Sequence, residues 1–159
     1  MSKIYVDEIA GIASPSTVAI PGHVIQVAQD TSYAQTVISS TSWTDTTLSV
    51  TMTPKSASSK FLISFAFENI YFQGGNRGVS FRIVRNGTSL FTPSAGYAIW
   101  NNDASGDHKG YSNIFLDESS HTLDPLTFTL EVAGYNTSTI DLNDGGAFKD
   151  TLIVQEIAG

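Results

Sequence analysis

The sequence predicts an all-β protein, an antiparallel β-sandwich (jelly roll) of about 8–10 strands with an extended N-terminal arm. Hydrophobic and polar residues alternate along most of the chain, which is the period of a half-buried strand. No window of about 12 residues carries a capped 3.6-residue pattern, so any helix is short. Clusters of Gly, Pro, Asn and Asp separate the candidate strands, and no internal repeat indicates a propeller.

Three alternating runs are the clearest strands. Residues 61–68 place three Phe and one Ile at the odd positions, while Ser64, Ala66 and Glu68 stand at even ones. Residues 47–52 and 126–132 alternate in the same way, so each is expected to bury one face. Weaker candidates are residues 23–29, 97–100, 111–116, 139–142 and 148–157.

A tight hairpin is predicted at Asn86-Gly87, between the strand-like runs 79–85 and 88–91. Asn-Gly in this position is the strongest short-range hairpin signal, because both central residues of a type I′ turn need a positive φ. The segment 68–74 resembles the recognition site of the tobacco etch virus protease, and we interpret it as native sequence that continues a strand up to the turn at Gly74-Gly75-Asn76. Residues 141–146 resemble a calcium loop only superficially and are expected to form a long hairpin turn.

Residues 1–22 are predicted to be an attachment arm, and residues 23–159 a jelly-roll head. The arm alternates weakly, and Pro21-Gly22 breaks the chain just before the first expected strand. An apolar arm without a core of its own needs a surface to lie on, so its apolar residues are the predicted partner-binding set. The alternative is a first edge strand of the same sandwich. The predicted partner-binding residues are Ile4, Tyr5, Val6, Ile9 and Ile12.

Composition narrows the class of function. The 159 residues suit one domain, 41% of them are hydrophobic, and the net charge of −7 argues against a nucleic-acid partner. Cysteine is absent, which excludes disulfides and thiolate zinc sites. No segment has the length and hydrophobicity of a membrane span or signal peptide, so no membrane partner is expected.

Catalytic and metal-binding constellations are not visible in the sequence, so neither an enzyme nor a cofactor is expected. His23, His108 and His121 each stand without a second histidine at ligand spacing. Loops 101–110 and 141–146 hold enough oxygen-bearing side chains for Ca²⁺, but solvated turns are the simpler interpretation and both readings stay open. The aromatic residues offer a carbohydrate platform, although packing is the commoner role. The candidates are Tyr33, Trp43, Tyr97, Trp100 and Tyr111.

Five segments together resemble virion proteins of tailed bacteriophages, especially marine and cyanobacterial ones. They are 2–9 (SKIYVDEI), 20–27 (IPGHVIQV), 42–54 (SWTDTTLSVTMTP), 58–63 (SSKFLI) and 152–157 (LIVQEI). The resemblance implies a jelly-roll head, similar to the tumour-necrosis-factor and C1q architecture, that assembles as a homotrimer in capsid decoration proteins, spikes and fibres. The chain has no coiled-coil or β-helical shaft, which a long fibre would need.

The resemblance and the arm together lead to two functional hypotheses. The first is a non-enzymatic virion protein, made in the host cytoplasm: a trimeric capsid decoration or cement protein whose arm binds the major capsid protein or another virion protein. The second is the receptor-binding tip of a tail fibre or spike, in which loops 101–110 and 143–147 contact host surface glycans. A cytokine or lectin is a weaker third hypothesis, because the chain lacks cysteine and a signal peptide.

Overall fold

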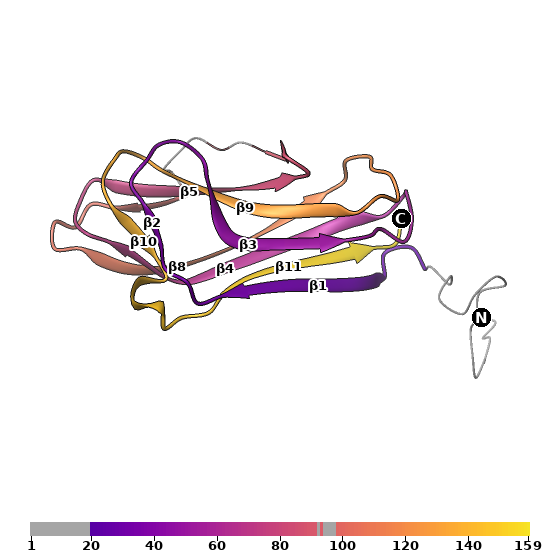
Figure 1. The fold of residues 1–159 in the computed structure, drawn as a ribbon, viewed down its shortest axis with the longest axis horizontal. Helices are drawn as coiled ribbons and strands as arrows, with labels where there is room; N and C mark the ends of the chain where they lie inside the picture. Colours follow the sequence, from indigo (N-terminus) through magenta and orange to yellow (C-terminus); the bar gives the residue numbers. More distant parts are fainter. Residues whose placement is uncertain (1–19, 92, 94–97) are drawn as a thin grey trace, which may run out of the picture.

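The computed structural model describes residues 20–91, 93 and 98–159. Within these residues the chain forms two antiparallel β-sheets that pack face to face, which confirms the predicted β-sandwich (Figure 1). Sheet A contains β1 (Val24–Ser32), β2 (Thr36–Ile38), β4 (Lys60–Phe72), β8 (Asp107–Asp117), β10 (Ile140–Leu142) and β11 (Asp150–Ile157). Sheet B contains β3 (Thr44–Met52), β5 (Arg77–Arg85), β6 (Thr88–Ser89), β7 (Ile99–Asn101) and β9 (Leu126–Gly134).

The strand order is that of a jelly roll. In sheet A, β4 lies between β11 and β8, and β1 pairs with the other edge of β11. In sheet B, β9 lies between β3 and β5, while β6 and β7 pair with the free edge of β5. The row β1-β11-β4-β8 therefore faces the row β3-β9-β5-β7, and most connections cross between the sheets as Greek-key topology requires.

The core lies between the sheets and consists of the alternating residues that the pattern assigned to buried faces. Phe61, Ile63, Phe65 and Phe67 of β4 point inward, as do the apolar positions of β9 and β3. The rings of Phe67 and Phe81 stack across the sandwich with 4.7 Å between their centroids. Such contacts between facing strands fix how the two sheets pack.

The hairpin prediction is confirmed at its turn. Asn86 and Gly87 have φ angles of 48° and 80°, the positive values that a type I′ turn needs. The returning strand is shorter than expected: β6 ends at Ser89 rather than at residue 91, and one further backbone hydrogen bond, from the Leu90 N–H to the Ile83 carbonyl at 2.9 Å, follows it.

One expectation about the strands is corrected. The prediction of a hairpin turn at 141–146 is wrong. β10 and β11 both pair antiparallel with β4, so the chain runs in the same direction in both strands. Between them it forms an outward loop that contains the 3-10 turn η2 (Asp144–Gly146). The described residues contain eleven strands, against an expected number of about 8–10. The addition that the pattern missed is β2, whose three residues are too few to show a period.

Of the predicted arm, residues 1–22, the structure describes only residues 20–22. The predicted arm residues Ile4, Tyr5, Val6, Ile9 and Ile12 lie outside the described residues. At the described start, the Gly22 N–H donates to the Ala158 carbonyl and the Ala158 N–H donates to the His23 carbonyl, each at 2.8 Å. The chain therefore enters the sandwich beside its own C-terminal strand.

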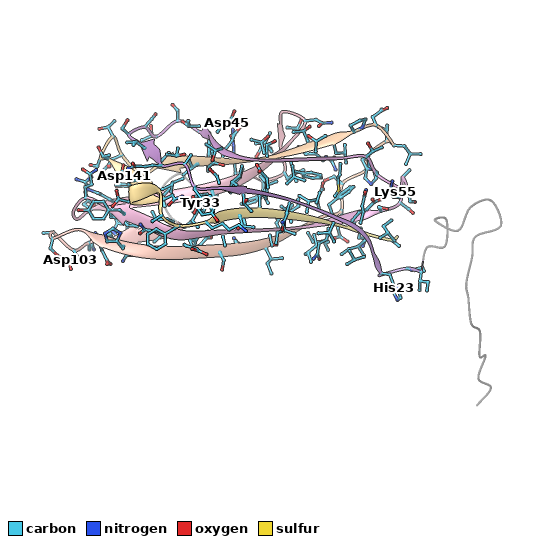
Figure 2. The ribbon with its side chains drawn as sticks, turned by 60° about the horizontal axis from the view of Figure 1, so that its bottom comes forward. His23, Tyr33, Asp45, Lys55, Asp103 and Asp141 are labelled. Carbon is cyan, nitrogen blue, oxygen red and sulfur yellow. The ribbon has the colours of Figure 1, made fainter. Side chains whose placement is uncertain are left out.

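The sandwich has two different ends. Figure 2 shows His23 and Lys55 at one end and Asp103 at the other. The first end, which we call the base, also holds the Asn86-Gly87 turn and the β8–β9 loop, while the second, which we call the tip, holds the β4–β5, β7–β8 and β9–β10 turns. Among the described residues, no helix is long and apolar enough to cross a membrane.

Candidate functional site

The outer face of sheet A is free of charge over its centre. Alternation in β1, β11, β4 and β8 turns every second side chain away from the core, and the pairing register brings these side chains together on one surface. We call this surface the sheet A face. It consists of Val24, Val27, Gln29, Thr31, Leu62, Ser64, Ala66, Ser112, Ile114, Leu116, Thr151, Ile153, Gln155 and Ile157.

Exposed aliphatic side chains concentrate on this face. The exposed fractions of Ile114, Val27, Val24 and Leu116 are 66%, 58%, 49% and 41%. A slot of about 210 Å³ runs beside Ile114, over the small side chains of Ser64, Ala66 and Ser112. An aliphatic patch of this kind on a soluble protein marks an interaction surface, because contact with water is unfavourable for every one of these groups.

Charges occur only where the sheet A face ends. Lys60 and Glu118 form an ion pair at the base end. Glu68 follows the outward-facing residues Leu62, Ser64 and Ala66 of β4 on the side towards the tip. A surface with an uncharged centre and a charged border has the composition of a protein–protein interface with a polar rim.

Sheet B presents the opposite chemistry on its outer face. Thr and Ser side chains cover β3, where they are exposed, and its neighbour β9, where they are half-buried, and the Thr51 and Thr127 hydroxyls form a cross-strand hydrogen bond of 2.8 Å. Arg82 on β5 forms an ion pair with Glu131 at 2.5 Å. This face is suited to water, so the two outer faces of the same sandwich differ in what they can contact.

A pocket of about 430 Å³ lies where the loop between β10 and β11 passes β4 and β8. We call it the end pocket. Its lining includes Glu68, Asn69, His108, Gly110, Asp144 and Phe148. A bulge in β4 between Phe67 and Ile70 interrupts the regular pairing and places Glu68 and Asn69 beside the loop.

Buried Asn69 organises the polar side of the end pocket. Its Nδ2 donates to the Asp144 carbonyl at 3.1 Å, so its Oδ1 is the atom that lies 2.7 Å from His108 Nδ1. Because Oδ1 only accepts, the hydrogen is assigned to Nδ1 of His108. The imidazole also stacks on Tyr71 with 4.5 Å between centroids, which fixes the plane of the ring.

Asn143 holds the β10–β11 loop in place through hydrogen bonds. This residue is fully buried with a φ of 54°, and its side chain both donates to the Phe148 carbonyl at 2.7 Å and accepts from the Phe148 N–H at 3.0 Å. Its own N–H donates to the Asn69 carbonyl at 2.7 Å. Phe148 is 40% exposed, so a rigid backbone presents an aromatic side chain to solvent at the pocket.

Behind this loop, Asp150 is a buried carboxyl at the start of β11. Burial raises the pKa of Asp150 from 3.8 to about 7; a hydrogen bond from the Glu68 backbone opposes the rise, and the Glu68 carboxylate adds to it. One of the Asp150 carboxylate oxygens has no hydrogen-bond partner. The sequence analysis missed this residue, because one acid at the start of an apolar run is no signal of burial.

In the candidate metal loops, Asp103, Asp107 and Asp141 interact with other residues of the protein. Hydrogen bonds from the Ser105 backbone and hydroxyl lower the pKa of Asp103, and Lys109 pairs with Asp107 at 3.1 Å. Asp141 lies in β10 and accepts a hydrogen bond of 2.8 Å from Gln73. Across the ranges that the structure describes, no three His, Asp or Glu side chains are grouped as metal ligands.

The three histidines do not come together. His23 is exposed at the base, and His108 lines the end pocket. His121 lies near carbonyl oxygens on both sides, with Nε2 2.9 Å from that of Ser59 and Nδ1 2.9 Å from that of Thr122. Its ring packs edge-on against Phe61, so it stabilises the base.

The predicted aromatic set is also dispersed. Trp43 lies under the Arg82 guanidinium at 4.7 Å, Tyr111 stacks on Phe81 in the core, and Tyr33 is exposed. Trp100 contacts Tyr135, a residue that the sequence analysis did not single out. Tyr97 lies outside the described residues.

The sheet A face was likewise missed by the sequence analysis. Its signal was present as apolar runs without alternation, Leu152-Ile153-Val154 and Ile114-Phe115-Leu116. Such runs indicate strands that are covered on both faces.

Comparison with known proteins identifies no family. No family model and no curated protein matches the chain. Among solved structures, it is similar to dimeric latent PorU from Porphyromonas gingivalis, with a TM-score of 0.43 and 9% sequence identity over 97% of this chain and 14% of PorU.

Proposed function

We propose that this chain is a non-enzymatic structural protein of a tailed-phage particle, a homotrimeric head that decorates the capsid and is tied to it by the N-terminal arm. The observation that carries the proposal is the sheet A face, which is uncharged at its centre and carries exposed aliphatic side chains, while the outer face of sheet B is polar. Three copies that meet through their sheet A faces would bury the exposed aliphatic side chains and leave sheet B in water.

The size of the sheet A face supports this assembly. Four strands spaced by about 4.8 Å, each contributing about eight residues at a rise of about 3.4 Å, give a projected area of about 500 Å². Side-chain relief makes the accessible area larger than this projection, so the face has the order of magnitude of one side of a protein–protein interface, roughly 800 Å². The resemblance of the sequence to trimeric phage heads supplies the number of copies.

The placement of the chain start supports the role of the arm. Residues 20–23 lie at the base beside Ala158, so an arm that precedes them leaves from the base and the tip is free to face outward. Three arms from one trimer would bind together with a high effective concentration, although each arm alone is weak.

Deleting residues 2–20 tests the arm. β1 begins at Val24 and pairs with β11 along its length, so we expect a soluble head that unfolds cooperatively but no longer joins particles that lack the protein. A truncated head that still binds such particles would place attachment on the head. Failure to fold would make residues 2–20 an integral strand.

The receptor-binding tip remains a second candidate function, and one observation favours it. The predicted glycan loops 101–110 and 143–147 supply His108, Gly110 and Asp144 to a single pocket. Quantitative mass spectrometry of purified particles separates the two functions, because a decoration protein is present in hundreds of copies and a fibre tip in tens at most.

A further inference from the structure

We infer that the end pocket binds one pyranose ring of a glycan, through its acceptor groups and the exposed ring of Phe148. The inference deepens the second candidate function and rests on it for the source of the sugar. The pocket chemistry itself is independent of how the head assembles.

The pocket offers several hydrogen-bond acceptors. Because His108 Nδ1 donates to Asn69, Nε2 is the ring nitrogen that remains for a ligand hydroxyl. One oxygen of Glu68 accepts from the Lys149 N–H at 3.3 Å, which leaves its second oxygen for a ligand. The Asp144 carboxylate has no partner among the residues that the structure describes. Hydroxyl groups donate well to carboxylates, and such charge-assisted bonds are the stronger kind.

An apolar surface adjoins these acceptors. Phe148 is partly exposed, and its two backbone hydrogen bonds with the Asn143 side chain hold its backbone in place. A pyranose has hydroxyl groups around its edge and C–H groups on its faces, so it can donate to the acceptors while one face packs on the aromatic ring. Because the His108 ring and the Phe148 backbone are held in place before binding, little conformational freedom is lost at these two residues.

Other ligand classes fit less well. Glu68 and Asp144 would repel a phosphate or a carboxylate. Lys109, which also lines the pocket, is already paired with Asp107. A purely aliphatic ligand would leave the polar groups without partners. An organic ammonium ion is the main competitor, since it also suits carboxylates and an aromatic ring.

Saturation-transfer difference NMR on the full chain tests the inference, with methyl glycosides of glucose, galactose, mannose and N-acetylglucosamine as probes. We expect at least one glycoside to bind with a dissociation constant on the order of 1 mM, because the pocket is open and the ligand small. Phe148→Ala and His108→Ala should each weaken binding about tenfold or more. Leu123→Ala, at an exposed apolar residue of the base, is the matched control and should leave it unchanged.

A blocking variant provides an independent check. A Cβ on Gly110 would lie 3.5 Å from the Glu68 carbonyl, an ordinary contact, so Gly110→Leu should fold and fill the pocket without disturbing the sandwich. Loss of binding in this variant, with an unchanged circular dichroism spectrum and melting temperature, would support the inference.

Three outcomes would overturn it. Absence of transfer from all four glycosides excludes the pyranose site. Binding that survives the pocket variants places the sugar elsewhere, and the receptor-tip function would then stand without this pocket. Displacement of the glycosides by n-butylamine at lower concentration than by free sugar would identify an ammonium site.

Discussion

Replacement of Asp150 by Asn is expected to remove a pH dependence from the stability of the sandwich. Asp150 is 3% exposed, and its pKa is raised from 3.8 to about 7. A rise of about 3 pH units corresponds to about 4 kcal/mol of free energy against the ionised form, since each unit is worth about 1.4 kcal/mol.

The sign follows from the direction of the shift. Because the pKa is higher in the folded state, the folded protein retains a proton between about pH 4 and pH 7 that the unfolded chain releases. The contribution of the neutral Asp150 carboxyl to the free energy of unfolding is fully present below about pH 4 and is lost as the pH rises through about 7. Asn is neutral throughout and keeps an oxygen for the Glu68 N–H. The variant should therefore differ little from the natural protein near pH 4 and be more stable by up to about 4 kcal/mol at pH 8.

Urea unfolding followed by tryptophan fluorescence at several pH values measures this difference. Subtracting the two unfolding free energies at each pH cancels the contributions of carboxyl groups that do not interact with Asp150, such as Asp103, whose lowered pKa acts in the opposite direction. A difference between variant and natural protein that stays constant from about pH 4 to pH 9 would refute the reasoning.

Three further predictions concern the fold. Glu156→Ala should cost about 3 kcal/mol in a urea titration, because the fully buried Glu156 carboxylate accepts hydrogen bonds from Gln26 and from the backbone of Lys55 and Ser56; a loss below about 1 kcal/mol would contradict this. A double-mutant cycle on Arg85 and Asp117, which pair at 2.7 Å between β5 and β8, should give a coupling of about 1–3 kcal/mol, and additive effects would show that the pair does not link the sheets. Tobacco etch virus protease should leave the folded chain intact on a gel and cut it only under mildly denaturing conditions. The segment 68–74, which resembles the recognition site of the protease, has Ile70 and Phe72 fully buried in β4. Rapid cleavage of the native protein would contradict that placement.

The strands could be predicted wherever one face is buried and the period is regular. β3, β9 and the first part of β4 meet this condition. The alternation in β4 ends at residue 68 because the bulge places two buried residues, Asn69 and Ile70, in succession. A local pattern cannot reveal such a shift, since it depends on pairing with β8 and β10.

The candidate sites depend on contacts between distant segments. Loops 101–110 and 143–147 were recognised separately for their polar residues, but only the pairing of β8 and β10 with β4 brings them to one pocket. Likewise, the apolar positions of the sheet A face belong to four strands, and their common surface follows from the register between those strands. Sequence alone therefore identified the loops as functional candidates but not the site that they form.

The mass of the protein in solution tests the central claim that copies assemble through the sheet A face. Light scattering coupled to size-exclusion chromatography at micromolar concentration should give three times the chain mass of 17.0 kDa. Ile114→Arg should give folded monomers with an unchanged circular dichroism spectrum, because Ile114 is 66% exposed on the single chain, whereas Thr129→Arg on the outer face of sheet B should remain trimeric. A natural protein of 17.0 kDa, or a trimer that tolerates Ile114→Arg, would contradict the account.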